Sequence, residues 1–294
     1  MPVSDKHDVF QRIRQKISRM SKAQRQIAAY IEAHPDTVPF LTTAQLAKQA
    51  GVGEATVIRF ATTLGFAGFT EMQRSLQEQL RKRVTTVERL DLAEELYSEE
   101  QRIAYEVLSD DLSNLKQTIQ MLDIDMFGKA VQQIHQAKSV TIIAFRSSHA
   151  LGSFLAFYLH LLKKNTRLIT ESDTMFEQLS TLGSNDLVIG ISFSRYTSRT
   201  VQALQYVRKQ GVKTLAITDS HRSPLANTSD LYLIAASSSP SFLDSFVAPL
   251  SLINALLIAV ARINKQEITR HLKNMEHLWE MEGIYYPSEN KIGR

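Results

Sequence analysis

The stretch that decides the fold of the N-terminal part is TTAQLAKQAGVGEATVIRF, residues 42–60. Thr42 or Thr43 is placed to cap a first helix, because a threonine oxygen accepts hydrogen bonds from the backbone N–H groups of the first turn. Gly51 ends that helix, since glycine adopts the left-handed conformation of a tight turn without steric cost. A second helix follows, so the stretch predicts a helix-turn-helix.

The apolar and small residues of this stretch have the spacing that packs two short helices together. The inward positions are Leu46, Ala47, Ala50, Val52, Val57 and Phe60. Ala47 is small where the two helices must approach closely. A generic helical hairpin is the alternative, but it does not require this combination of small, glycine and apolar positions.

The second helix of a helix-turn-helix enters the major groove, and the outward residues near its N-terminus meet the base edges first. Arg59 is suited to a bidentate contact with guanine, Glu54 accepts from cytosine, and Thr56 binds base or phosphate. For each of these side chains, a solvated surface role is the alternative. The candidate DNA-binding residues are Thr43, Glu54, Ala55, Thr56 and Arg59.

The net charge of +4 is unevenly distributed along the 294 residues. Residues 1–90 contain 14 Lys and Arg against 8 Asp and Glu, whereas the remainder contains 20 against 22. A basic excess around the helix-turn-helix favours a phosphate backbone as partner, although a solvated basic helix face has the same composition.

The length predicts two globular domains. The lack of cysteine and of a secretory signal at Met1 makes the cytoplasm the expected compartment. The hydrophobic fraction of 44% and the charged fraction of 22% are typical of neither a disordered nor a membrane protein. The absence of cysteine excludes disulfides and thiolate metal sites, and we expect no metal and no cofactor. The apolar run 246–263 contains Pro249 and Arg262, so we interpret it as a core helix and subunit interface and expect no membrane partner.

The predicted secondary structure changes at about residue 112. Before it, short helices are expected; after it, apolar strands alternate with helix-length segments, which predicts a parallel sheet with helices on both faces. The predicted strands are 139–145, 167–170, 186–192, 213–218 and 231–234. The predicted fold is therefore an all-α helix-turn-helix domain followed by an α/β domain with a parallel five-stranded sheet flanked by helices. The predicted divisions are a DNA-binding domain at 1–80, a charged helical linker at 81–111, an effector and oligomerisation domain at 112–275 and a tail at 276–294.

Residues 21–76, SKAQRQIAAYIEAHPDTVPFLTTAQLAKQAGVGEATVIRFATTLGFAGFTEMQRSL, resemble the N-terminal domain of the RpiR family of transcriptional regulators. The matching features are the helix ending at His34-Pro35, the helix with Leu46-Ala47, the segment 55–60, Leu64-Gly65-Phe66 and Gly68-Phe69. The resemblance implies a C-terminal SIS (sugar isomerase) domain, which the chain resembles over about 120–265. Such domains typically hold a phosphosugar with hydroxyl-rich loops that follow the first and third strands.

Hydroxyl and arginine side chains follow the first and third predicted strands of this chain. The candidate effector-binding residues are Arg146, Ser147, Ser148, Ser192, Ser194, Arg195 and Thr197. A strand-to-helix turn offers free N–H groups and the positive end of a helix, hydroxyls add donors, and arginines supply charge. Helix capping by serine and threonine is the alternative.

The chain departs from the family pattern at three positions in these loops. Ala144 and Arg146 stand in the first loop, which commonly carries glycines, and Arg195 replaces the glycine of a Ser-x-Ser-Gly-x-Thr pattern. An arginine fills space and adds charge where the backbone normally approaches the ligand.

The sequence thus predicts a DNA-binding transcription regulator, a homodimer or homotetramer on double-stranded operator DNA, controlled by a small anionic metabolite of phosphorylated sugar type. One alternative is an aldose–ketose phosphate isomerase with an appended helical domain. The other is a DNA-binding protein whose SIS domain only oligomerises. We expect no enzyme, because no spacing selects a catalytic pair from His135, His149, His221, Glu171, Asp173 and Glu177.

Overall fold

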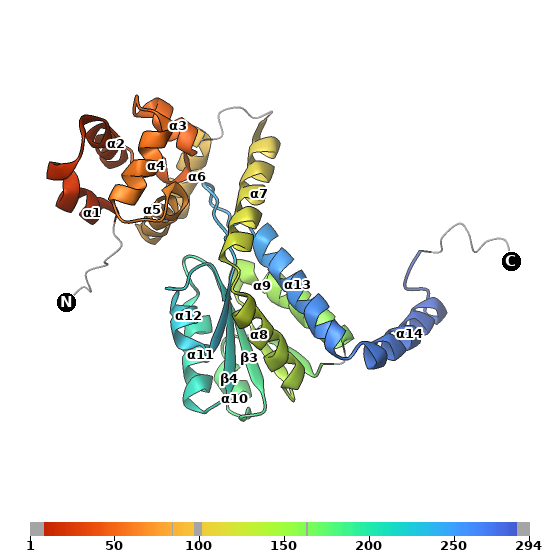
Figure 1. Cartoon of the computed structure of the whole chain (residues 1–294). Helices are drawn as coiled ribbons and strands as arrows, with labels where there is room; N and C mark the ends of the chain where they lie inside the picture. Colours follow the sequence, from red (N-terminus) through yellow and green to blue (C-terminus); the bar gives the residue numbers. More distant parts are fainter. Residues whose placement is uncertain (1–8, 84, 97–101, 163, 287–294) are drawn as a thin grey trace, which may run out of the picture. The chain divides into compact units, whose positions relative to one another are not determined.

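The computed structural model describes residues 9–83, 85–96, 102–162 and 164–286. The chain divides into two compact units, coloured along the sequence in Figure 1. The first comprises residues up to Asp110 together with Ser238–Asp244, and the second comprises Asp111–Ser237 together with the residues from Ser245 onward. The segment Ser238–Asp244, which lies inside the range predicted for the effector domain, is thus grouped by its contacts with the helical unit.

The first unit is helical, as its sequence predicts. Its elements are α1 (Val9–Lys16), η1 (Ile17–Arg19), α2 (Lys22–Ala33), η2 (Val38–Phe40), α3 (Thr43–Gln49), α4 (Glu54–Thr63), α5 (Phe69–Arg83) and α6 (Thr86–Leu96). His34 is the C-cap of α2, as expected for a residue that precedes proline. Val57 and Phe60 of α4 pack with Leu46 of α3, Ile27 of α2 and Met72 of α5 in one fully buried cluster.

Replacing Ser21 with alanine is expected to lower the free energy of unfolding of this unit by about 1 kcal/mol. The Ser21 hydroxyl accepts from the Gln24 backbone N–H at 3.3 Å, and the Gln24 side chain accepts in return from the Ser21 N–H at 3.1 Å. Ser18 is exposed in η1 and provides the matched control, for which a change within about 0.5 kcal/mol is expected. Urea denaturation followed by circular dichroism measures both, and equal losses would contradict the capping role.

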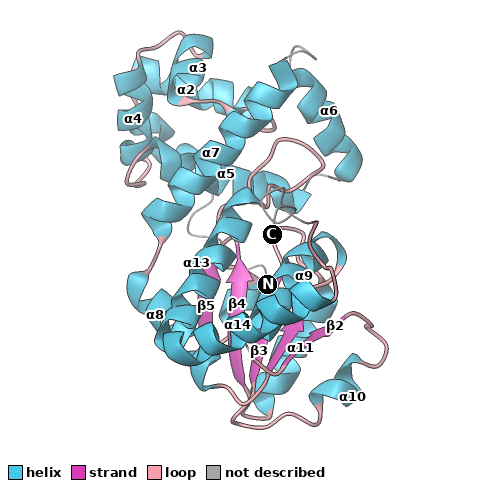
Figure 2. Ribbon diagram, turned by 90° about the vertical axis from the view of Figure 1, so that its right-hand side faces the viewer, coloured by secondary structure: helices cyan, strands magenta, loops and turns pink. Residues whose placement is uncertain are grey.

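The second unit is an α/β fold around one parallel sheet, drawn in magenta in Figure 2. Within the described residues its strands are β1 (Val140–Ile143), β2 (Thr166–Ile169), β3 (Leu187–Ile191), β4 (Lys213–Thr218) and β5 (Leu231–Ile234). Its helices are α7 (Ile103–Met121), which begins in the first unit, α8 (Ile124–Gln136), α9 (His149–Leu161), α10 (Met175–Leu179), α11 (Ser198–Lys209), α12 (Pro224–Thr228), α13 (Val247–Ile263) and α14 (Lys265–Met281), with a short η4 (Arg146–Ser148) before α9. The five predicted strands and the predicted fold class are confirmed.

Helices cover both faces of the sheet because the strands are apolar on both sides. Ile142 and Ile189 face α8, α9 and α13 in one buried cluster. Ile143 and Val188, each next to one of these residues in its strand, face α10, α11 and α12 in another. The second unit therefore has three layers, and its loops at the sheet edges are free to form a site.

The strand order β2-β1-β3-β4-β5 determines where a ligand fits. The chain winds from β1 to β2 on one side and from β3 to β5 on the other, so the winding reverses between β1 and β3. These two strands pair in parallel, with Ile143 opposite Gly190. The loops that follow them therefore leave the same edge of the sheet from neighbouring strands, which lie about 5 Å apart.

The apolar run 246–263 forms α13, whose inward residues are buried in the sheet cluster. Within the described ranges, no single helix is long and apolar enough to cross a membrane. Only α13 and α14 together reach that length and composition, and they are bent by 105° at the break between them. Helix α14 continues to Met281, past residue 275, where the tail was predicted to begin.

Candidate functional site

Helices α3 and α4 form the helix-turn-helix at the predicted residues. Thr42 rather than Thr43 caps α3: its hydroxyl accepts from the Gln45 N–H at 3.2 Å, and the Gln45 side chain accepts from the Thr42 N–H at 2.7 Å. Thr43 is the first residue of α3 and is half-buried. Gly51 turns the chain with a φ of 67°, in the left-handed region that favours glycine.

The outward face of α4 presents most of the predicted DNA-binding residues to solvent. Glu54, Ala55 and Arg59 are exposed, whereas Thr56 is half-buried at the edge of this face. The Arg59 guanidinium donates to the Thr56 hydroxyl at 3.3 Å, which holds the arginine against its own helix. Arg59 and Thr56 therefore lie together on the outward side of α4.

Sequence reasoning missed Ile58, which lies on the same outward face. It is 47% exposed, although its neighbours Val57 and Phe60 are fully buried. The periodicity of α4 contained the signal, because Ile58 lies one turn after Glu54 and Ala55 and opposite the buried positions.

The loop after β1 places its residues at the start of α9. Ser148 is buried at the N-cap position, whereas Arg146 and Ser147 are exposed. Arg146 has a φ of 56°. A side chain in the left-handed region is strained, by about 1–2 kcal/mol relative to the right-handed one.

The loop after β3 is closed by a hydrogen bond between its two ends. The buried Ser192 hydroxyl accepts from the Thr197 backbone N–H at 3.1 Å. Arg195, at the tip, has a φ of 61° and is exposed. Thr197 is the N-cap residue of α11, but its side chain forms no capping hydrogen bond. Helix capping, the alternative role considered for these hydroxyls, therefore does not apply to Thr197. The loop thus resembles a preformed turn with an arginine where glycine is the least strained residue.

Asp219, immediately after β4, is a second residue beside a candidate site that sequence reasoning did not consider. Its carboxylate accepts from the Ser194 backbone N–H at 3.2 Å and from the Tyr196 hydroxyl at 2.8 Å. This carboxylate supports the β3 loop from the neighbouring strand. It also places a negative charge beside the loop that carries Arg195.

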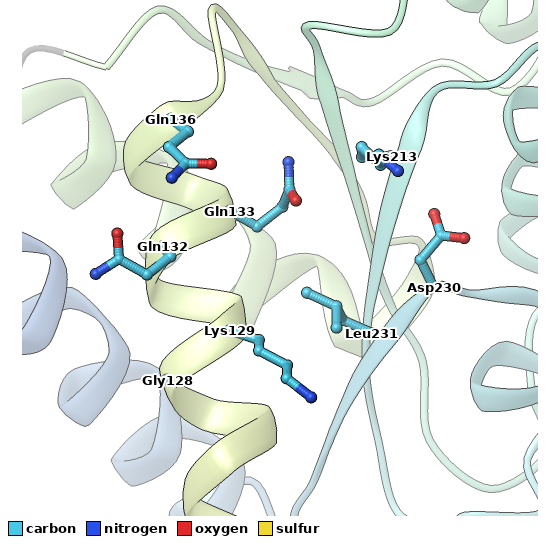
Figure 3. Close-up of a pocket in the computed structure, with 8 residues that line it drawn as sticks. All are labelled: Gly128, Lys129, Gln132, Gln133, Gln136, Lys213, Asp230 and Leu231. Atoms are coloured by element: carbon cyan, nitrogen blue, oxygen red, sulfur yellow. The ribbon is translucent and has the colours of Figure 1, made fainter.

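A groove of about 500 Å³ lies at the other edge of the sheet, between α8 and the starts of β4 and β5 (Figure 3). Asp230 is engaged there by the Thr214 backbone N–H and hydroxyl, both at 2.9 Å. Gln132 of α8 points away from Lys213 and Asp230 in Figure 3. Since a ligand site needs convergent polar groups, we assign none to this groove.

The histidines considered for catalysis are separated in the structure. His149 contacts Ser153 at 3.2 Å within α9, and the ring of the exposed His221 lies edge-on to Tyr232 at 5.5 Å. His135 is half-buried near the end of α8. Across residues 9–286, leaving out the undescribed positions, no three His, Asp or Glu side chains are grouped as a metal site would require.

A helix-turn-helix with an exposed face on its second helix, followed by a parallel sheet with hydroxyl-rich loops at its switch point, is the architecture of a transcription regulator of the helix-turn-helix class with a C-terminal α/β domain. Two family models match the chain: the helix-turn-helix domain of the rpiR family over residues 7–83 and the SIS domain over residues 133–259. The chain belongs to the RpiR family of transcriptional regulators, as the motifs predicted.

Relatives and solved structures are similar either to nearly the whole chain or to its α/β part alone. An uncharacterized HTH-type transcriptional regulator of Caldanaerobacter subterraneus is 27% identical, over 94% of this chain and 99% of its own length. The sugar isomerase domain of an RpiR transcription factor from Sphaerobacter thermophilus is 31% identical, with a TM-score of 0.58, over 60% of this chain and 99% of that one. The Vibrio vulnificus NanR protein complexed with ManNAc-6P is 21% identical, with a TM-score of 0.56, over 92% of this chain and 97% of that one.

Proposed function

We propose that this regulator binds a specific duplex DNA sequence through α4 and changes its DNA affinity when a small phosphorylated metabolite, of sugar-phosphate type, occupies the loops after β1 and β3. The DNA-binding residues are Thr43, Glu54, Ala55, Thr56 and Arg59. The effector-binding residues are Arg146, Ser147, Ser148, Ser192, Ser194, Arg195 and Thr197. Residues 1–80 read DNA, 81–111 connect, 112–275 sense and oligomerise, and 276–294 form a tail.

The observation that carries the effector site is the pair of left-handed arginines. Arg146 and Arg195 follow neighbouring parallel strands at the switch point, and both have positive φ. Strained backbone is retained where it serves a function, since glycine would adopt the same conformation without cost. Two guanidinium groups beside serine hydroxyls and helix N-termini suit a phosphate monoester.

DNA selection from a random pool tests this function. Selected fragments should bind at least about a thousandfold more tightly than unrelated DNA, with an affinity that falls steeply with salt. Glucose 6-phosphate, N-acetylmannosamine 6-phosphate or a related sugar phosphate should change that affinity about 5–150-fold, whereas the unphosphorylated sugars should not. A protein with no salt-sensitive sequence preference would overturn the proposal.

A turnover assay with the same sugar phosphates, run beside the DNA-binding measurement, separates the alternatives. We propose that the chain is not an enzyme, because a sugar phosphate isomerase needs a base positioned on the substrate carbon. Turnover of any of the sugar phosphates would support the isomerase instead. Sequence-specific DNA binding that ignores every sugar phosphate would support a SIS domain that only oligomerises.

We also propose that α9 and α13 form the subunit interface of a homodimer. The two helices contact each other on one face of the sheet. Helix α9 contains no Asp, Glu, Lys or Arg, and α13 contains only Arg262. Their outward sides still expose Phe157 and Ile258, each at 63%. Depletion of charge around exposed aromatic and aliphatic side chains is typical of an interface core.

Replacing Phe157 with alanine is expected to raise the dimer dissociation constant about tenfold, because truncating a central aromatic residue costs more than about 1 kcal/mol. In a twofold dimer each protomer loses the contact. Ile124→Ala on α8, where the side chain is 68% exposed, is the matched control and should leave the constant unchanged. Sedimentation velocity over a dilution series measures both, and an unchanged Phe157→Ala dimer would place the interface elsewhere.

A further inference from the structure

The outward row of α4 has an apolar residue at its centre. Glu54, Ala55, Ile58, Arg59 and Thr62 are all exposed and recur at the spacing of one helix face. Ile58 lies between polar side chains, and Ala55 one turn earlier is small enough to allow close approach. The core of the unit does not use Ile58, because Val57, Phe60 and Ala61 fill the inward side of the helix.

We infer that Ile58 determines part of the DNA specificity by contacting the methyl group of a thymine, an inference that rests on the proposed DNA binding through α4. In the major groove, the thymine C5-methyl is the apolar group at a base edge, and side chains recognise it by apolar contact. Arg59, the next residue, is suited to guanine. Since one residue advances 1.5 Å along the helix and base pairs are about 3.4 Å apart, the thymine should lie within about two base pairs of that guanine.

Single thymine-to-uracil substitutions in a selected operator fragment test this inference, because they remove only the methyl group. At one thymine, wild type should lose about fourfold in affinity, the value of one buried methyl-sized group. Ile58→Ala should bind thymine DNA more weakly than wild type and should not distinguish uracil from thymine at that position. Ile17→Ala, an isoleucine 40% exposed in η1, is the control and should keep the discrimination.

Each outcome is decisive for Ile58. An Ile58→Ala protein that binds like wild type, or that still loses affinity on the uracil fragment, would overturn the thymine contact. Either result would leave the proposed function standing, since wild type would still bind its operator. Failure of wild type to select any DNA would instead remove the proposed function itself.

A second inference arises from the segment between β5 and α13, which contacts α6 within the helical unit. Arg89 of α6 is only 5% exposed and donates to the Leu243 carbonyl at 2.8 Å and to the Asp244 carboxylate at 3.0 Å. A buried arginine persists only with such partners, because an unpaired buried charge is costly. The predicted linker is therefore not simply a solvated connector: at Arg89 it binds a segment more than 150 residues away in the chain.

The same segment also contacts the loop after β3, which belongs to the proposed effector site. Phe246, two residues after Asp244, lies with its ring 5.5 Å from the ring of Phe193. Phe193 stands between Ser192 and Ser194 in the sequence of the loop after β3, and its side chain is buried. Packed side chains in a protein interior move together because few voids separate them.

We propose that effector binding is transmitted to α6 through four residues: Phe193, Phe246, Asp244 and Arg89. Helix α6 directly follows α5, which packs with the helix-turn-helix in the first unit. When the β3 loop closes on an anion, Phe193 shifts, Phe246 follows, and the Asp244–Arg89 ion pair carries the change to α6. The inference rests on the proposed effector site. Control of DNA binding then requires that the anion favours one of two positions of the segment.

Hydrogen exchange of α6 amides tests this path. The probe is whichever of glucose 6-phosphate, N-acetylmannosamine 6-phosphate and inorganic phosphate stabilises wild type in a thermal shift. The probe should change exchange within α6 at least about threefold in wild type, consistent with coupling of 5-fold or more between sites. Asp244→Asn and Phe246→Leu should keep the thermal shift and lose the α6 response. Arg208→Met, which removes the exposed pair with Asp230 at 3.6 Å, is the control and should respond like wild type.

The results distinguish the path from the site. An α6 that does not respond while the probe binds, or an α6 response retained in both variants, would overturn the path and leave the effector site intact. If none of the three probes binds, the proposed effector site is wrong and the path fails with it.

Discussion

Replacing Arg146 and Arg195 together with glycine is expected to raise the stability of the α/β unit and to weaken sugar phosphate binding about a hundredfold. Each arginine occupies the left-handed region, with φ values of 56° and 61°. Glycine removes that strain, and after the greater freedom it adds to the unfolded chain the net gain is about 1 kcal/mol for the pair. A charge-assisted hydrogen bond contributes about 1.5–3 kcal/mol, so the loss of two accounts for the lower affinity.

Two matched variants separate strain from charge. Replacing both arginines with alanine keeps the left-handed strain and removes the charge, so affinity should fall without any gain in stability. Replacing both with lysine keeps the charge and should retain part of the affinity, reduced because the bidentate fork is lost. Calorimetric titration and thermal denaturation measure the two effects. A diglycine variant that binds sugar phosphates like wild type would exclude both arginines from the site.

The strands and the two helices of the helix-turn-helix were predictable because their sequence signals are local. Runs such as 213–218 and 231–234 are apolar and bounded by turn residues, and the structure places β4 and β5 at those residues. The family pattern also singled out Arg146 and Arg195, since it has glycine at such positions. The left-handed φ values supply the physical reason for that glycine, which composition alone does not reveal.

The contacts that depend on tertiary structure were not predictable. Asp219 supports Ser194 only because β4 lies beside β3, a neighbour relation set by the sheet order. Arg89 appeared to be one charge in a charged linker, yet it is buried against Asp244. Ser192 was expected to bind ligand, and its hydroxyl already accepts from the Thr197 N–H within the loop. Each of these contacts depends on the folded structure, either because the two residues are far apart in the sequence or because the loop must first adopt its turn. Local sequence patterns contain neither kind of information.

Replacing Arg59 with alanine is expected to weaken binding to the selected operator about 10–100-fold, because one bidentate arginine–guanine pair contributes about 1–3 kcal/mol. The Arg59 guanidinium is exposed on α4 and is held at 3.3 Å from the Thr56 hydroxyl, which limits the freedom it loses on binding. The loss should be confined to one base pair: changing that pair should harm wild type and leave Arg59→Ala unaffected.

Salt dependence decides whether Arg59 reads a base or binds phosphate. A base-reading arginine leaves the slope of log affinity against log salt nearly unchanged, whereas a phosphate contact lowers its magnitude by about one. Lys48→Ala removes an exposed cation from the last turn of α3. Its salt slope provides the comparison for Arg59→Ala, because both residues are cations of the helix-turn-helix. If Arg59→Ala weakens all DNA equally and reduces the slope, Arg59 positions the protein on the backbone. The sequence preference must then come from the other proposed residues of α4: Glu54, Ala55, Thr56 and Ile58.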